Sequence, residues 1–146
     1  MGIYEISNVI AVAFGGMAII VSFYTFYKSK RERSYADIDR LYLELLKLGI
    51  QYPKFVDPKN TSNYKNAFKG EELLRYEIYA YISWNICETI YDRKDDILFE
   101  TWKPVIIAEN KLHRRWFDNP ENHHKFKDRF RDYIQNNYSQ EYKNIK

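Results

Sequence analysis

Cysteine is nearly absent from this sequence. The single cysteine, Cys87, cannot form an internal disulfide, which excludes the disulfide-stabilised small domains and is typical of a reducing compartment. The sequence also lacks paired cysteines or histidines at metal-site spacing, a glycine-rich phosphate loop and a nucleophile elbow. The common zinc-binding, nucleotide-hydrolysing and esterase classes therefore have no support, and we expect neither a metal nor a cofactor.

Charge is missing from the beginning of the chain. Residues 8–27 contain no Asp, Glu, Lys or Arg and no proline, and they are apolar or small almost throughout. About 20 such residues match the roughly 30 Å hydrocarbon core of a bilayer, so we expect a transmembrane helix. A signal peptide has a basic start, whereas the first residues read MGIYEIS. A buried core helix rarely has so long an uncharged stretch.

Basic residues flank only the C-terminal side of this segment. They are Lys28, Lys30, Arg31 and Arg33. Cytoplasmic flanks collect Lys and Arg, so we expect a single-pass protein of the inner (plasma) membrane with its N-terminus outside. The same cluster can contact anionic head groups at the membrane surface. The expected domains are residues 1–33, the membrane helix and basic juxtamembrane segment, and residues 34–146, a cytosolic helical domain.

Small residues recur along the uncharged segment at spacings of four, three and four: Ala11, Gly15, Ala18 and Ser22. These spacings place them on one helical face. Small faces let membrane helices approach closely, so we predict a homo-oligomer that associates through this stripe in the lipid bilayer. The alternative is that Gly and Ala are simply common in membrane helices.

Glycine and proline are both absent between Gly16 and Gly49. This absence favours one helix that continues from the membrane to Gly49, with Ile38, Leu41, Leu45 and Leu48 as its apolar stripe. The competing interpretation places a break at Ser34, where Ser34-x-x-Asp37 resembles an N-cap. A continuous helix would transmit movement between the bilayer and the cytosolic domain.

The remaining sequence predicts an all-α fold: a helical bundle of about four cytosolic helices. Aromatic residues make up 18% of the chain, which is too much for a disordered segment. We expect polar loops over residues 51–70 and an apolar helix over 71–92 that is buried on several sides, with Leu73, Leu74, Ile78, Tyr81, Ile82, Ile86 and Ile90 at its apolar positions and Tyr76, Tyr79, Trp84 and Tyr91 over much of the rest. Asp95 and Asp96 can cap a helix over 97–116 that Pro104 kinks or splits. Asn119-Pro120-Glu121 predicts the start of the last helix.

A basic and aromatic stretch over residues 111–131 is the strongest candidate binding site. Its basic residues outnumber its acidic ones by seven to three, and its phosphate-binding candidates are Lys111, Arg114, Arg115, Lys125, Lys127, Arg129 and Arg131. Trp116 or Phe117 could stack on a base. The alternatives are a solvated face over an aromatic core, or contact with lipid head groups. Duplex nucleic acid is not expected as a partner.

Other polar residues give weaker signals. Glu109 and His113 share a helical face, and His123 lies beside His124, but no regular ligand spacing appears, so surface histidines are the plainer interpretation. The polar residues on the apolar helix, Glu77, Asn85 and Glu88, could be buried with raised pKa values, although ion pairing is the commoner role. Cys87 is expected to be a packing residue. We therefore predict a non-enzyme.

The uncharged segment, the basic flank and the basic stretch together give an organisation that resembles small single-pass bacterial defence effectors. The membrane-bound effectors of CRISPR-associated cyclic-oligoadenylate signalling are examples. The resemblance implies ligand binding inside the cell, oligomer rearrangement and membrane disturbance during antiviral defence. It rests on organisation rather than on a family motif, and it assigns no binding residue.

Three functional hypotheses follow. The first is a membrane protein whose helical domain binds a phosphate-rich ligand, such as a cyclic nucleotide, or a partner, and couples this to the oligomeric membrane helix. The second is a membrane-tethered adaptor for protein–protein interaction, and the third is a tethered enzyme. A sensor predicts one concave basic patch, an adaptor predicts an exposed aromatic patch, and an enzyme predicts polar groups that converge in a closed pocket.

Overall fold

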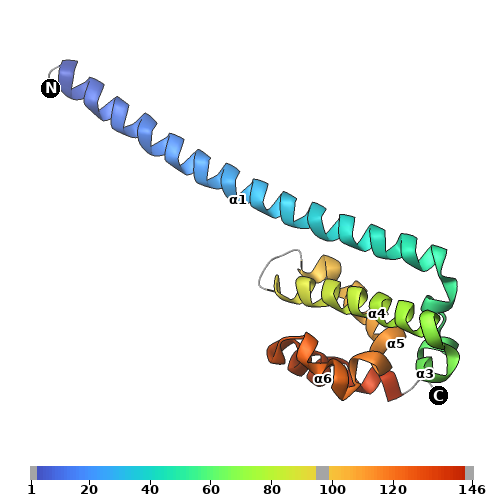
Figure 1. The fold of residues 1–146 in the computed structure, drawn as a ribbon. Helices are drawn as coiled ribbons and strands as arrows, with labels where there is room; N and C mark the ends of the chain where they lie inside the picture. Colours follow the sequence, from blue (N-terminus) through green and yellow to red (C-terminus); the bar gives the residue numbers. More distant parts are fainter. Residues whose placement is uncertain (1–2, 95–98, 144–146) are drawn as a thin grey trace. The chain divides into compact units, whose positions relative to one another are not determined.

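Helices are the only regular secondary structure among the described residues of the chain. The computed structural model describes the backbone of residues 3–94 and 99–143 and the side chains of residues 17–94 and 99–139. Over these residues the all-α prediction is confirmed, with no strand (Figure 1). The elements are α1 (Ile3–Gln51), η1 (Pro53–Val56), α2 (Pro58–Thr61), α3 (Tyr64–Ala67), α4 (Gly70–Tyr91), α5 (Phe99–Phe117), η2 (Pro120–Lys125) and α6 (Asp128–Lys143).

Helix α1 is one continuous helix of 49 residues. It passes through Ser34 without a break, because no glycine or proline interrupts the sequence between Gly16 and Gly49. The chain divides into two compact units, Met1–Asp37 and Ile38–Lys146, and each is described by itself. We call the second unit, residues 38–146, the helical unit.

The N-terminal unit contains the segment that the sequence predicts to be transmembrane. Among the described residues, no helix combines the length and the apolar character needed to cross a membrane. The side chains of Ala11 and Gly15 lie outside the described residues. Ala18 and Ser22 are exposed, and so are the four basic residues of the flank, Lys28, Lys30, Arg31 and Arg33.

The connection between α1 and α4 is more ordered than a polar loop. The expectation of loops over residues 51–70 was wrong, since η1, α2 and α3 all form there. Pro58 occupies the first turn of α2, and the Asp57 carboxylate accepts a hydrogen bond from the Lys59 backbone N–H at 2.9 Å. Gly49 is also held tightly, because an added Cβ would lie 3.1 Å from the Tyr79 hydroxyl.

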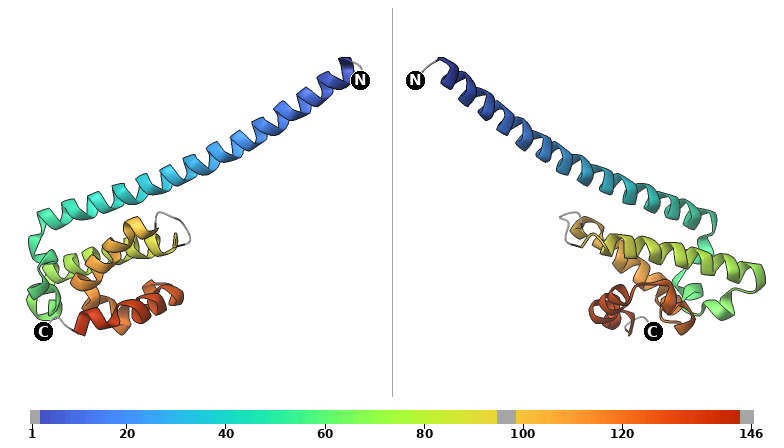
Figure 2. Two further views of the ribbon diagram at one scale, coloured as in Figure 1. Left: turned by 180° about the vertical axis from the view of Figure 1, so that it is seen from behind. Right: turned by 60° about the vertical axis from the view of Figure 1, so that its left-hand side comes forward.

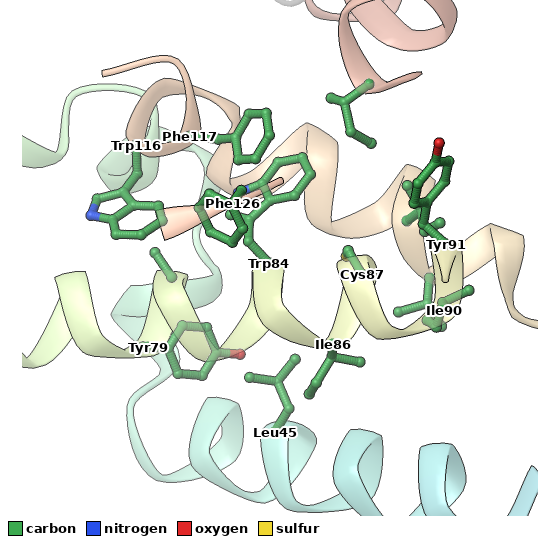
Figure 3. Close-up of a cluster of buried hydrophobic side chains, with 14 of the residues drawn as sticks. Leu45, Tyr79, Trp84, Ile86, Cys87, Ile90, Tyr91, Trp116, Phe117 and Phe126 are labelled. Atoms are coloured by element: carbon green, nitrogen blue, oxygen red, sulfur yellow. The ribbon is translucent and has the colours of Figure 1, made fainter. Parts of the chain in front are cut away.

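Helix α4 is the centre of the helical unit, but one of the sides that the sequence predicts to be buried is exposed. Its aromatic residue Tyr76 is buried, and so are Tyr79, Trp84 and Tyr91, which Figure 3 shows. The positions expected to face the core, Leu74, Ile78 and Tyr81, are exposed instead. The buried side carries Tyr76, Trp84 and Tyr91, whose large rings bury more apolar area than Leu74 and Ile78 would.

Helix α5 packs against both α4 and α6 (Figures 1 and 2). Pro104 does not split it: α5 is one helix with Pro104 close to its beginning. Trp84 of α4 stacks on Phe117 at the other end of α5, with ring centroids 4.0 Å apart. The proposed cap at Asp95 and Asp96 lies outside the described residues.

The segment after Asn119 begins with a short 3₁₀ helix rather than the last α-helix. Asn119 caps η2 as predicted, and its side chain accepts a hydrogen bond from the Glu121 N–H. Helix α6 starts later, at Asp128, where the Glu88 carboxylate accepts a hydrogen bond from the Lys127 N–H at 2.9 Å. Glu88 is thus a structural cap from α4 rather than a catalytic acid.

Phe130 tests this packing. Its side chain is fully buried, and its ring centroid lies 6.1 Å from that of Trp84 and 5.4 Å from that of Tyr91. We expect Phe130→Ala to lower the free energy of unfolding by about 3–5 kcal/mol, because it leaves a cavity between α4 and α6. Urea denaturation measures this loss. The exposed Leu74→Ala is the control, and an equal loss in both variants would contradict this core.

Candidate functional site

The basic stretch is largely neutralised by ion pairs. Lys127 and Arg129 both bind the Asp92 carboxylate, the Arg129 guanidinium at 2.7 Å. Burial alone would raise the pKa of Asp92, but the hydrogen bonds and charges of Lys127 and Arg129 outweigh it and lower the pKa. Arg131 pairs with Asp128 in the same way. With Arg114, which pairs with Asp118, four of the seven predicted phosphate-binding residues therefore bind carboxylates of the chain itself.

Arg114 is a structural residue rather than a ligand residue. Only 2% of it is exposed. Its guanidinium donates hydrogen bonds to Asp118 at 2.7 Å, Asn110 at 3.0 Å and Gln135 at 2.5 Å. These bonds join α5 to α6 and use the donors that a phosphate would need. The assignment of Arg114 to a phosphate site is therefore corrected.

The proposed stacking residues are also inside the core. Trp116 is fully buried and Phe117 is nearly so. Lys125 covers the outer side of Trp116, with its ammonium 4.9 Å from the ring centroid, and donates a hydrogen bond to Asn122 at 2.6 Å. Neither ring is available to stack on a base. The prediction of a stacking site was wrong because the same pattern, aromatic residues beside basic ones, also occurs where aromatic side chains form a core beneath a charged surface.

Two predicted residues are exposed and have no carboxylate partner among the described residues: Lys111 and Arg115, one turn apart on α5. Lys125 has an amide partner but no carboxylate. The structure does not gather the seven cations into one site, and three of them, Arg114, Lys127 and Arg129, connect helices instead.

A second group of polar residues is buried between α4 and α5. The Ser83 hydroxyl donates a hydrogen bond to the Glu109 carboxylate at 2.6 Å. The same carboxylate oxygen lies 3.5 Å from His113 Nε2, and His113 Nδ1 lies 3.1 Å from the Tyr76 hydroxyl. The prediction of surface histidines was therefore wrong for His113, which is fully buried. We call Tyr76, Ser83, Glu109 and His113 the buried polar cluster.

Burial decides the charge of this cluster. It lowers the pKa of His113 to about 3, so that imidazole is neutral at neutral pH. Burial also raises the pKa of Glu109, and the hydrogen bond from Ser83 opposes that shift. Both directions arise because a low-dielectric interior disfavours the charged form.

The buried polar cluster has residue types of a hydrolase but not the geometry. The Ser83 hydroxyl contacts the carboxylate rather than the imidazole, so the histidine does not activate it. Glu109 is 4% exposed and the Trp84 indole donates a hydrogen bond to the His113 carbonyl at 3.2 Å. The cluster ties α4 to α5. It could have been found from the seven-residue spacing of Tyr76 and Ser83, which matches two helical turns.

Metal binding has no site among the residues that the structure describes. No group of three or more His, Cys, Asp or Glu residues there could hold an ion. His124 is exposed on η2, and the adjacent His123 is half-buried. Cys87 is fully buried, and burial raises the pKa of its thiol, so it packs as an inert apolar residue.

The most conspicuous surface feature lies on the outer face of α4. Leu74 is 57% exposed, Ile78 is 51% exposed and Tyr81 is 39% exposed. Their spacings of four and three place them in one row along the helix. We call these three residues the α4 stripe. The sequence does not reveal this stripe, because apolar and aromatic residues at helical spacing on several sides of one helix predict that all of these sides are buried.

In comparisons with known proteins, no family model, no curated protein and no solved structure matches the chain.

Because the pKa of His113 is lowered in the folded chain, the stability of the fold should depend on pH. The unfolded chain binds a proton at His113 below about pH 6.5, whereas the folded chain does so only near pH 3. His113 therefore stabilises the fold above pH 6.5, and this contribution is lost as the pH falls toward 3. Between pH 7 and 4.5 we expect the loss to be roughly 2–3 kcal/mol.

The matched variant is His113→Gln, measured by urea denaturation in detergent at both pH values. Glu109 titrates in both proteins with the opposite sign, because its raised pKa favours folding at low pH. The difference between wild type and variant isolates His113. A difference that does not change with pH would show that His113 is not held neutral.

Proposed function

We propose that this chain is a non-enzymatic, membrane-tethered adaptor whose helical unit docks a partner protein on the α4 stripe. The observation that carries the proposal is the exposure of Leu74, Ile78 and Tyr81 in one row on a helix whose other faces are buried. Contiguous exposed apolar side chains cost free energy in water and commonly mark interaction surfaces.

The surroundings of the α4 stripe indicate the chemistry of the partner. A row at spacings of four and three fits the apolar face of an amphipathic helix. Beside the stripe, Glu71 and Arg75 form an ion pair at 2.6 Å and cancel each other. Lys125 lies 5.9 Å from the Tyr81 ring and has no carboxylate partner among the described residues. We therefore propose a partner helix with an apolar stripe and a carboxylate that meets Lys125.

The tether is proposed for residues 8–27. Its support is the absence of charge over this segment and the basic flank that follows it. Large apolar and aromatic side chains cover most of the circumference of the described part, and Ala18, Ser22 and Thr25 occupy the remaining face. Each large side chain is between 57% and 70% exposed: Met17, Ile19, Ile20, Val21, Phe23, Tyr24, Phe26 and Tyr27. A helix that is apolar over most of its circumference needs an apolar environment. We propose that it crosses the inner membrane with the helical unit in the cytoplasm.

The adaptor is favoured over the ligand sensor and the enzyme. A sensor needs free cations in one place, whereas Arg114, Lys127, Arg129 and Arg131 bind groups of the chain itself. For a phosphate-rich ligand, only the basic residues without a carboxylate partner remain candidate binding residues. An enzyme needs reacting groups that a substrate can reach, and the buried polar cluster is enclosed. The role in antiviral defence stays a prediction from the resemblance.

The tether is tested by extraction of native membranes with alkaline carbonate. We expect the full chain to stay in the membrane fraction. Val12→Arg combined with Ile20→Arg should release it, because each charge at the centre of a span costs about 2.5–3.5 kcal/mol on insertion scales. Leu74→Arg is the control and should stay in the membrane. Release of the wild type would contradict the tether.

The docking surface is tested by a photo-crosslinker at Ile78 in native membranes. The crosslinked partner is identified by mass spectrometry, purified and titrated against the full chain in detergent. We expect Ile78→Glu to weaken binding at least about tenfold, since it places a charge at the centre of the apolar row. Leu41→Glu, an equally drastic change on an exposed apolar residue of α1, is the matched control.

Both variants should keep the unfolding midpoint of the wild type, because both positions are exposed. Equal affinity of Ile78→Glu and wild type would rule out docking on the α4 stripe. A crosslinked product that consists of two copies of this chain would make the stripe an oligomer interface instead.

A further inference from the structure

The helical unit has a second exposed apolar face, on the part of α1 that belongs to it. Leu43 is 49% exposed, Leu46 is 43% exposed and Ile50 is 82% exposed. The inner face of the same segment, with Ile38 and Leu45, is 1% exposed and packs on the core. Figure 3 shows Leu45 directed at Ile86 and Tyr79 of α4.

This outer face is separate from the inner one. At about 100° per residue, Leu43, Leu46 and Ile50 fall within an arc of roughly 60°. The arc lies about a third of a turn from the row of Ile38 and Leu45. A neighbouring helix can therefore cover the outer face without displacing any contact of the core. We call Leu43, Leu46 and Ile50 the α1 seam.

The α1 seam has the spacing of a coiled coil. Steps of three and four make Leu43 and Ile50 positions a and Leu46 position d of a heptad, and Asp39 is the preceding d. In the sequence, Ser22 precedes Leu43 by 43 − 22 = 21 residues, and Ala18 precedes Leu46 by 46 − 18 = 28. Both separations are whole heptads. The small residues of the predicted membrane stripe thus share the heptad register of the α1 seam.

We propose that the α1 helix of a second copy of this chain covers the α1 seam, in a parallel two-stranded coiled coil. The heptad register favours a helix as the occupant, and charge complementarity favours a second copy. Side chains at d pack beside position e of the facing helix in a parallel pair. Asp39 at d would then face Asp39 of the second copy, and Arg40 at e of each helix would flank this layer, so that two-fold symmetry brings one guanidinium beside each carboxylate.

Asp39 and Arg40 are suited to this exchange. Neither has an ion-pair partner within the described part of the chain, and Arg40 is exposed. A parallel pair in register places the same residue numbers of the two helices side by side, which is what brings Asp39 beside Arg40 of the second copy. The parallel direction also follows from the proposed membrane tether, because two chains inserted with the same orientation present α1 in the same direction. Only this second reason for the parallel direction rests on the proposed function.

Cysteine scanning of the full chain in native membranes tests the proposal. Single variants Leu43→Cys, Leu46→Cys and Ile50→Cys are oxidised, and the disulfide-linked dimer is measured with time. Leu41→Cys is the matched control, because Leu41 is 42% exposed on the other flank of the same helix segment. The native Cys87 is fully buried and serves as the background in the wild type.

We expect all three seam variants to form dimers at least about tenfold faster than Leu41→Cys, because a disulfide needs Cβ atoms about 3.5–4.5 Å apart. Equal rates at the seam and at Leu41, or no dimer at all, would overturn the seam. A dimer at only one of the three positions would overturn the parallel arrangement, since an antiparallel pair brings like positions together only near its two-fold axis. The carbonate extraction reports separately on the tether.

Discussion

The contact between α4 and α5 is the interaction on which the rest of the helical unit depends. Trp84 stacks on Phe117 with ring centroids 4.0 Å apart, and its indole donates a hydrogen bond to the His113 carbonyl at 3.2 Å. The Ser83 hydroxyl donates to Glu109 across the same interface. Stacked rings supply the apolar burial, and the polar bonds specify which turn of α4 meets which turn of α5.

This contact determines what α4 leaves outside. Once Tyr76, Trp84 and Tyr91 point inward, helical geometry places Leu74, Ile78 and Tyr81 on the outer surface. The chain therefore exposes apolar side chains as a consequence of burying larger aromatic ones. The same reasoning applies to α1, where one apolar row packs on the core and a second row remains uncovered. Two uncovered rows on different helices suit two different occupants.

Much of the fold could be predicted from the sequence, and much of the site could not. The absence of glycine and proline was sufficient for the continuous α1, and Asn119 correctly indicated a helix start. Hydrophobic periodicity could not predict which side of α4 is buried, because its aliphatic and aromatic rows both have helical spacing. Arg114 resembled a phosphate ligand in the sequence because one of its hydrogen-bond partners, Gln135, lies on another helix, 21 residues away. The partner on its own helix, Asn110, does not by itself indicate that Arg114 is buried. Burial of His113 depended on α4, which the local sequence around it does not contain.

Hydroxyl-radical footprinting tests most directly whether the outer row of α4 is a docking surface. The full chain is labelled once in native membranes and once after purification in detergent, and side-chain oxidation is measured by mass spectrometry. The account predicts that Leu74 and Tyr81 are oxidised in the purified protein and protected in native membranes, while the buried Tyr76 and Trp84 are protected in both. Equal oxidation of Leu74 and Tyr81 in the two preparations would contradict it.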